Sequence, residues 1–594
     1  MEKLILNSKK LISDKNDKNF FLGKWFVNCL SKDQKKNINF SYFDTENFNF
    51  ENETKKLNYT KKISKDILNE IIPVLNQLNG VKWKYKIWNI FIGHWLHHFV
   101  AVVLDRINLV KPLFKSNINY EEQLSIGKNA SLASYNLRDF TRNAGLIEWN
   151  EKFISRIIYL ISTNNFNNDE SLLNSKKNFK SKKENFFTII KYNCSIAILK
   201  FLEKILCKEN NYLFYNSYIK NKSKLFKIIV RLGDFPFLYS FPFFNKRKIK
   251  KGIDLNLRKK FKINFDSVDL DLKIVKFLLI ECLPTIYLEG FKLQKELADN
   301  SHLPKKTKVV FTSAVYDDET FKFWLADKMN SGTKLAHGQH GGGAYFILKE
   351  LFWETFEFEI SNKYFNWGTR KNNLNPINIG NYLLDTKNEN KNINSQKFLV
   401  VFSTSDLFKR SALIWDYYHY MTDGVDQTQT FFDNINFSSV NELNLRLHPQ
   451  DRHRRELQYS NFIEFKNNKI NKVNYKSRFD KLVKKHSLII FTYLSTEFFK
   501  MMALNKPCLV LINKKNIDNL FNAVAKKDFE KLIDVGILHT NGLSLANKLN
   551  LISNNIENWW NNKEIIKAKD EFCKNYSNPH FNIDTFINEL KILK

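Results

Sequence analysis

The chain has 594 residues, more than one hydrophobic core supports, so we expect two or three domains. Hydrophobic residues make up 43% of it and aromatic residues 15%, which excludes an extensively disordered protein. The formal net charge of +32 suits a nucleic-acid or membrane partner, yet lysine is scattered along the chain rather than gathered in one motif. The six cysteines form no CxxC pair, so neither a zinc site nor a disulfide framework is expected.

The N-terminal half is predicted to be mainly helical. Its first residues lack the basic region and apolar core of a signal peptide, so we expect a cytoplasmic protein. The most apolar segment, 87–104, contains His94, His97 and His98, which would be costly in lipid. We therefore interpret it as a buried helix rather than a membrane span. No HExxH pattern accompanies these histidines, and no bound metal is predicted.

From residue 308 the pattern changes to strands alternating with helices, which is typical of a doubly wound α/β domain. Strands are predicted at 308–312 and 334–337, with a helix at 321–330 between them. Asp317 follows the first of these strands, where the ligand crevice of an open α/β sheet lies. It is a candidate general base, and capping of the next helix is the simpler alternative.

A glycine-rich turn follows the strand at 334–337. Gln339 and His340 would project from this turn toward a cleft, and Gly341 and Gly342 would let backbone amides approach a ligand closely. His340 is a candidate acid, base or phosphate donor. The turn is neither GxGxxG nor a Walker loop, and a purely structural turn remains the alternative.

A second α/β domain is predicted after a polar linker at 385–396. Ser403 follows its first strand, at 397–402, and either faces the cleft or caps a helix. Arg446 and His448 lie at the end of a strand at 443–447. Guanidinium groups match phosphate geometry, so this strand end is a candidate phosphate site, with an ordinary surface role as the alternative.

Residues 486–512 predict a strand, a turn, a helix and a second strand, which together form a parallel crossover. Ser495 and Thr496 can cap the helix, and Glu497 lies in its first turn. A helix N-terminus that follows a parallel strand is a ready anion site, although an ordinary βαβ unit without a ligand has the same pattern.

These segments together resemble, nearly from end to end, a family of bacterial surface-polysaccharide transferases of the leptospiral O-antigen type. The resemblance rests on Leu22–Trp25, Trp88–Leu96, Phe311–Ser313, Phe321–Trp324, Gly338–Gly343, Arg446 to Pro449, Ser495-Thr496, Asn505–Pro507 and Trp559-Trp560. More remotely, the C-terminal unit resembles capsule Kdo transferases and CDP-glycerol glycerophosphotransferases, which have the GT-B architecture of two Rossmann-like domains facing a cleft.

The resemblance implies an α/β protein of the GT-B type with a helical N-terminal elaboration. The expected divisions are 1–300 for the helical, acceptor-side part with some of the first Rossmann-like domain, 301–384 for its remainder, 385–396 for a linker, 397–560 for the nucleotide-sugar domain and 561–594 for helices that pack back.

It also implies roles for the candidate residues. His340 or Asp317 would be the base, without a cofactor or metal. The donor would contact Gln339, Gly341, Gly342, Ser403, Arg446, His448, Ser495, Thr496, Glu497 and Lys500. Lys500 stands where the family pattern has a glutamate, so Glu497, one helical turn earlier, would replace it.

The function implied is transfer of a sugar from a nucleotide-activated donor to a polysaccharide or lipopolysaccharide intermediate, with peripheral contact with the anionic inner membrane. Two alternatives remain: transfer of a polyol phosphate from a CDP-polyol, or a basic RNA- or membrane-binding protein without enzymatic activity. No RNA-binding signature is present, so nucleic acid is not expected as a partner.

Overall fold

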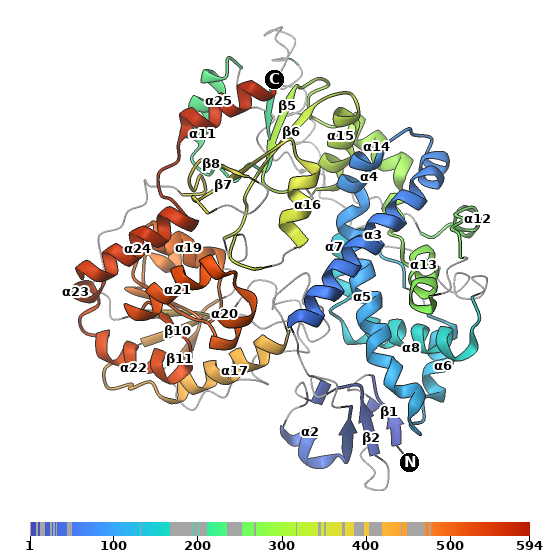
Figure 1. Ribbon diagram of the computed structural model, residues 1–594, viewed down its shortest axis with the longest axis horizontal. Helices are drawn as coiled ribbons and strands as arrows, with labels where there is room; N and C mark the ends of the chain where they lie inside the picture. Colours follow the sequence, from blue (N-terminus) through green and yellow to red (C-terminus); the bar gives the residue numbers. More distant parts are fainter. Residues whose placement is uncertain are drawn as a thin grey trace.

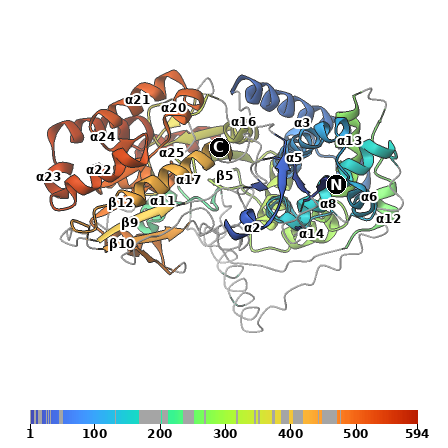
Figure 2. The same ribbon diagram turned by 90° about the horizontal axis from the view of Figure 1, so that it is seen from below.

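The structure is a computed structural model in which helices of the N-terminal half and two parallel sheets occupy different parts of the molecule (Figure 1). Figure 2 shows the C-terminal elements and the N-terminal helices on opposite sides. The structure describes residues 2–594 apart from 7–9, 12–17, 24–25, 28–29, 31, 44–49, 131, 167–193, 195–200, 202–210, 235–251, 266–268, 316–317, 343–345, 350–351, 371–374, 385–396, 403–417, 441, 448–469 and 475–476.

The N-terminal region combines a small parallel sheet with a helical core. The sheet has the order β1-β2-β3, with strands β1 (Glu2–Leu4), β2 (Lys18–Phe21) and β3 (Phe40–Tyr42). The helical elements are α2 (Lys32–Asn37), α3 (Phe50–Asn79), α4 (Tyr85–Trp88), the π-helix η2 (Asn89–Gly93), α5 (His94–Val110), the 3-10 helix η3 (Lys111–Lys115), α6 (Glu121–Lys128), α7 (Leu137–Asn143), α8 (Ile147–Thr163), α12 (Leu255–Lys259), α13 (Leu270–Cys282), the 3-10 helix η5 (Thr285–Tyr287) and α14 (Phe291–Asp299).

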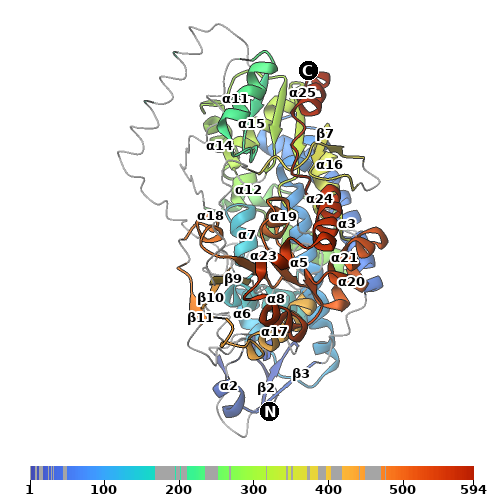
Figure 3. The same ribbon diagram turned by 90° about the vertical axis from the view of Figure 1, so that its left-hand side faces the viewer.

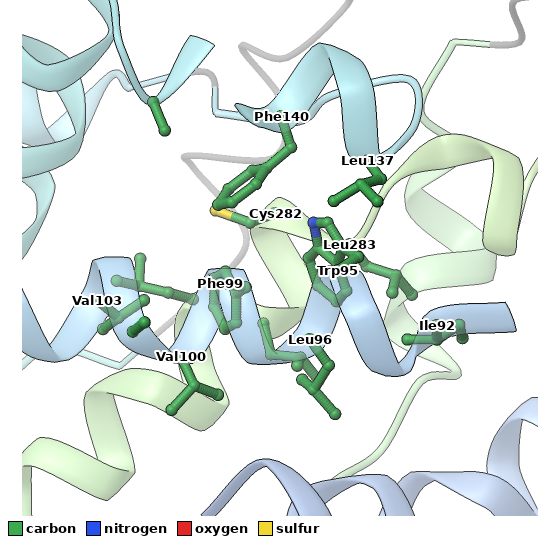
Figure 4. Close-up of a cluster of buried hydrophobic side chains, with 14 of the residues drawn as sticks. Ile92, Trp95, Leu96, Phe99, Val100, Val103, Leu137, Phe140, Cys282 and Leu283 are labelled. Atoms are coloured by element: carbon green, nitrogen blue, oxygen red, sulfur yellow. The ribbon is translucent and has the colours of Figure 1, made fainter. Parts of the chain in front are cut away.

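Helix α5 runs through the centre of this helical core. Trp95 stacks on Phe99 with ring centroids 5.1 Å apart, and Phe140 and Cys282 approach from α7 and α13 (Figure 4). The continuous helical stretch 85–115 is long and apolar enough to cross a membrane, but 94% of its most apolar window is buried inside the protein. The prediction of a buried helix is therefore confirmed.

The first Rossmann-like domain contains five parallel strands in the described residues, in the order β4-β5-β6-β7-β8. They are β4 (Tyr212–Phe214), β5 (Val309–Thr312), β6 (Lys334–Gly338), β7 (Lys363–Asn366) and β8 (Ile377–Asn378), accompanied by α11 (Lys222–Arg231), α15 (Glu319–Asn330) and α16 (Phe352–Ile360). All four residues of β5 are buried, as expected for a parallel sheet covered on both faces.

In the part of the second Rossmann-like domain that the structure describes, six parallel strands lie in the order β11-β10-β9-β12-β13-β14. Along the chain, β10 and β11 are added on one side of β9, whereas β13 and β14 are added on the far side of β12. The topological switch point of the sheet therefore lies between β9 and β12. The strands are β9 (Lys397–Phe402), β10 (Glu442–Leu447), β11 (Ile470–Lys472), β12 (Leu488–Phe491), β13 (Cys508–Leu511) and β14 (Leu538–His539). The helices are α17 (Tyr418–Asp433), α18 (Phe479–Val483), α19 (Thr496–Ala503), α20 (Lys514–Leu520), α21 (Ala523–Asp534), α22 (Gly542–Ile552) and α23 (Ile556–Trp560).

The C-terminal helices connect the two sheets. Helix α24 (Lys563–Tyr576) packs on the second domain, whereas α25 (Ile583–Leu593) returns to the first (Figures 1 and 3). Phe586 of α25 is buried against Phe311 of β5 and Phe365 of β7, with ring centroids 4.9 and 5.0 Å away. The end of the chain therefore packs on both domains. The predicted linker at 385–396 lies outside the described residues.

Two parallel α/β sheets joined by returning C-terminal helices form the arrangement predicted as GT-B-like, so the predicted fold class is confirmed. Direct contacts also join the domains. The segment at Leu348 forms an antiparallel bridge with Phe521, and the Arg370 guanidinium donates from Nε to Asp528 Oδ2 over 2.7 Å. Since Asp528 lies on α21, this bond fixes the segment that follows β7 to the second domain.

Replacing Phe586 by alanine should test the return of α25. The change removes a fully buried ring from the first sheet, so we expect the free energy of unfolding to fall by about 3–5 kcal/mol. Urea unfolding followed by tryptophan fluorescence measures this loss. Ile592→Ala on the same helix is the matched control, since its side chain is 72% exposed and its loss should cost under about 0.5 kcal/mol. Equal effects of both changes would show that α25 does not pack as described.

Candidate functional site

Helix α19 starts at the switch point of the second sheet. Strand β12 pairs with β9 on one side and β13 on the other, and it ends at Phe491, shortly before Ser495. The Ser495 hydroxyl caps α19 by accepting a hydrogen bond from the backbone N–H of Phe498 over 3.3 Å. The predicted strand, cap, helix and strand are therefore confirmed, and the positive end of the helix dipole lies beside the crossover.

The glycine-rich turn follows β6 at the carboxyl end of the first sheet. Its Gln339 is 2% exposed, and it faces inward rather than toward the cleft as predicted. The side-chain nitrogen of Gln339 donates to Gly341 O over 2.7 Å, and its side-chain oxygen accepts from Trp367 N over 3.1 Å. Because both ends of the amide are used within the first domain, Gln339 shapes the turn instead of pointing into a cleft.

The turn and helix α19 meet directly. The backbone N–H of Gly342 donates to Thr496 Oγ1 over 3.4 Å. A Cβ atom at Gly342 would lie 2.6 Å from the ring of Phe499, so any side chain there would force the two elements apart. The glycine-rich turn of the first domain and the Ser495-Thr496 segment of the second are therefore neighbours in the structure.

His340 lies in the same turn and is bonded to a residue that the sequence analysis did not identify. Its Nδ1 atom is 3.1 Å from Oε1 of Glu357 on α16. The His340 side chain is 28% exposed, whereas that of Glu357 is fully buried. The segment 352–360 contains three glutamates, and its local pattern does not distinguish Glu357 from Glu354 and Glu359.

Two further histidines lie close to this pair and are both held neutral. Burial lowers the pKa of His337 to about 4, partly offset by Glu357, whose Oε2 is 3.7 Å from His337 Nδ1. Burial also lowers the pKa of His94 on α5 well below its usual range, helped by His98, whose Nε2 is 2.9 Å from His94 Nε2. No group of three potential metal ligands occurs among the residues that the structure describes.

Glu497 and Lys500 form an ion pair on the first two turns of α19. The Lys500 Nζ is 2.8 Å from Glu497 Oε1, and the Lys500 and Glu497 side chains are 12% and 30% exposed respectively. The pair holds one carboxylate and one ammonium group next to the switch point. The donor-binding roles predicted for these two residues and for Ser495, Thr496, Gly341 and Gly342 stay predictions.

Arg446 is the one remaining candidate in the part of the chain that the structure describes. Arg446 is at the end of β10, and its guanidinium lies 5.1 Å from the centre of the Phe479 ring on α18. Asp317, Ser403 and His448 lie outside the described residues. The neighbouring Asp318 caps α15 by accepting from Phe321 N over 3.1 Å, which is the capping role considered for this acidic segment.

Solved structures with a related arrangement share little sequence with this chain. The chain is similar to the UDP-GlcNAc 2-epimerase from Neisseria meningitidis bound to UDP-GlcNAc, with 14% identity, a TM-score of 0.35, and coverage of 65% of this chain and 99% of that one. It is also similar to MurG from Acinetobacter baumannii, with 11% identity, a TM-score of 0.30, and coverage of 65% and 100%. At such low identity, the substrate of this chain must be argued from its own residues.

No curated protein matches the chain. A family model described as LIC12162 family transferase matches residues 2–589, which is nearly the whole chain. The match agrees with the transferase family suggested by the glycine-rich turn and the Ser495-Thr496 segment. The chain therefore belongs to the LIC12162 transferase family.

Proposed function

We propose that the protein transfers a sugar from a nucleotide-activated donor to a hydroxyl group of a cell-surface polysaccharide or lipopolysaccharide intermediate. The observation that carries this proposal is the contact between Gly342 and Thr496. It joins the carboxyl end of a strand in one parallel sheet to a helix N-terminus at the switch point of the other. Ligands of open α/β sheets bind in this position.

The residues around this contact suit the phosphates of such a donor. The backbone N–H groups in the first turn of a helix and the dipole behind them favour negative charge. Lys500 adds a positive charge one turn later, and Glu497 offers oxygen atoms that can accept hydrogen bonds from ribose hydroxyls. Gly342 has no side chain, and this lets the turn lie directly against α19.

In this proposal His340 accepts the proton of the acceptor hydroxyl. In the proposed step the acceptor oxygen forms a bond to the anomeric carbon of the sugar. The bond from that carbon to the phosphate oxygen breaks with its electron pair leaving on the nucleotide, and the hydroxyl proton passes to His340. The amides at the start of α19 would stabilise the negative charge that develops on the leaving phosphate.

A thermal-unfolding screen with CMP, CDP, UDP, GDP and dTDP tests the donor site. We expect one nucleotide to stabilise the protein, by about 2.7 kcal/mol when its concentration is 100 times its Kd. Lys500→Met and Glu497→Gln should each weaken binding about tenfold, because each loses a charged partner of the nucleotide. Lys515→Met is the control, since Lys515 is an exposed lysine on α20 and its loss should leave binding unchanged.

Three results would contradict parts of the proposal. Stabilisation by none of the five nucleotides, together with salt-sensitive RNA binding, would contradict transfer from a nucleotide donor. Stabilisation that Lys500→Met and Glu497→Gln leave intact would place the donor elsewhere. Release of CMP from a CDP-polyol, with transfer of the polyol phosphate to the acceptor, would replace sugar transfer by the alternative reaction.

We further propose peripheral contact with an anionic membrane, supported by the outer face of α11. The ten residues of this helix include Lys222, Lys227 and Arg231 but no acidic residue, and Arg231 pairs with Asp584 of α25. Phe226 and Val230, one turn apart on its outer side, are 48% and 51% exposed. Basic and apolar side chains together on an exposed helix face suit the surface of an anionic bilayer.

Replacing Phe226 and Val230 together by serine should weaken this membrane contact. Because both side chains would lose their insertion into the interface, we expect about tenfold weaker binding to vesicles of phosphatidylcholine and phosphatidylglycerol in a sedimentation assay. Leu551→Ser is the control, since its side chain on α22 is 77% exposed but belongs to the other domain. Unchanged binding of the double variant would rule out α11 as the contact.

A further inference from the structure

The carboxylate of Glu357 is the centre of a small hydrogen-bonded group beneath the glycine-rich turn. Its Oε1 is 3.1 Å from His340 Nδ1, and its Oε2 accepts a hydrogen bond from the Tyr364 hydroxyl over 3.0 Å. The side chain is fully buried. A buried carboxylate is costly unless it is paired and hydrogen-bonded, so these two contacts account for its presence on an otherwise apolar helix face.

The pairing fixes which nitrogen of His340 carries the proton. In the neutral ring one nitrogen donates and the other accepts, and a carboxylate can only accept. Nδ1 must therefore carry the hydrogen that faces Glu357, which leaves the lone pair on Nε2. The same carboxylate attracts the positive charge that appears when Nε2 takes up a proton.

We propose that Glu357 is a positioning residue that fixes the orientation and the tautomer of the His340 ring, so that Nε2 is the nitrogen that accepts the proton. This inference rests on the proposed function, in which His340 receives the proton of the acceptor hydroxyl. Glu357 does not itself take the proton: it remains a carboxylate while the imidazole becomes an imidazolium, and the imidazolium later returns the proton to water. Tyr364 acts one step further away, since its hydroxyl holds the second carboxylate oxygen in place.

Two other titratable groups face the pair of His340 and Glu357. His337 faces the pair from β6, and His94 interacts with it from α5. Burial lowers the pKa of both rings and keeps them neutral, so neither adds a positive charge that would oppose protonation of His340. A change at Glu357 should therefore appear directly in the chemical reactivity of His340.

The test follows the reaction of His340 with diethyl pyrocarbonate from about pH 5 to about pH 8.5, with the modified peptide quantified by mass spectrometry. The reagent attacks the neutral ring, so the midpoint of the pH profile reports the protonation of this histidine. We expect Glu357→Gln to lower the midpoint by about one pH unit, because the neutral amide no longer stabilises the imidazolium. Tyr364→Phe should raise it, because a carboxylate with one hydrogen bond fewer attracts the ring charge more strongly.

Glu359→Gln is the matched control for this experiment. Glu359 is an exposed acid on the same helix, its partner is Asn89 Nδ2 at 3.3 Å, and the midpoint should not move. An unchanged midpoint in both Glu357→Gln and Tyr364→Phe would overturn the inference, whether or not nucleotides bind. The measurement needs no donor, so a shifted midpoint in a protein that binds no nucleotide would refute the proposed function while leaving the positioning of His340 by Glu357 supported.

Discussion

The contact between the glycine-rich turn and helix α19 is the constraint on which the site depends. The backbone N–H of Gly342 in the first domain donates to Thr496 of the second, and the Phe499 ring lies against the same glycine. No space for a side chain remains between the two domains at this point. A second contact follows a few residues later, where Asn522 Nδ2 donates to Phe346 O over 3.0 Å while the side-chain oxygen of Asn522 caps α21. The end of the turn and the segment that follows it are therefore both tied to the second domain.

The parallel sheets explain why chemistry gathers at this contact. All strands of a parallel sheet end at the same edge, so the polar residues that follow them lie close together although they are distant in sequence. In the first domain this edge carries the glycine-rich turn, and beneath it α16 supplies the carboxylate of Glu357. In the second domain it carries Ser495 at the start of α19. The helical N-terminal region completes this environment through His94 on α5.

The sequence was sufficient to predict the parts of the structure that local patterns determine. Buried apolar runs in the sequence located β9 and β12. The Ser495 cap was predictable because a capping side chain bonds to a backbone N–H of the helix that it begins, a few residues away in sequence. Long-range contacts were not predictable in this way. Gln339 was expected to face the cleft, since nothing local shows that Trp367 and Gly341 would bind both ends of its amide. Glu357 was missed because it is one of three glutamates in the segment 352–360, and only its long-range partners distinguish it from the other two.

Hydrogen–deuterium exchange tests the central claim, that one donor site is shared by the two domains, most directly. Peptides covering 339–342 and 495–500 would be followed by mass spectrometry with and without each of the five nucleotides. If the account is right, one nucleotide slows amide exchange in both peptides at the same concentration, because the backbone of the turn and the first turn of α19 surround the same phosphates. Protection of only one of these peptides, or of neither while the nucleotide binds elsewhere, would contradict it.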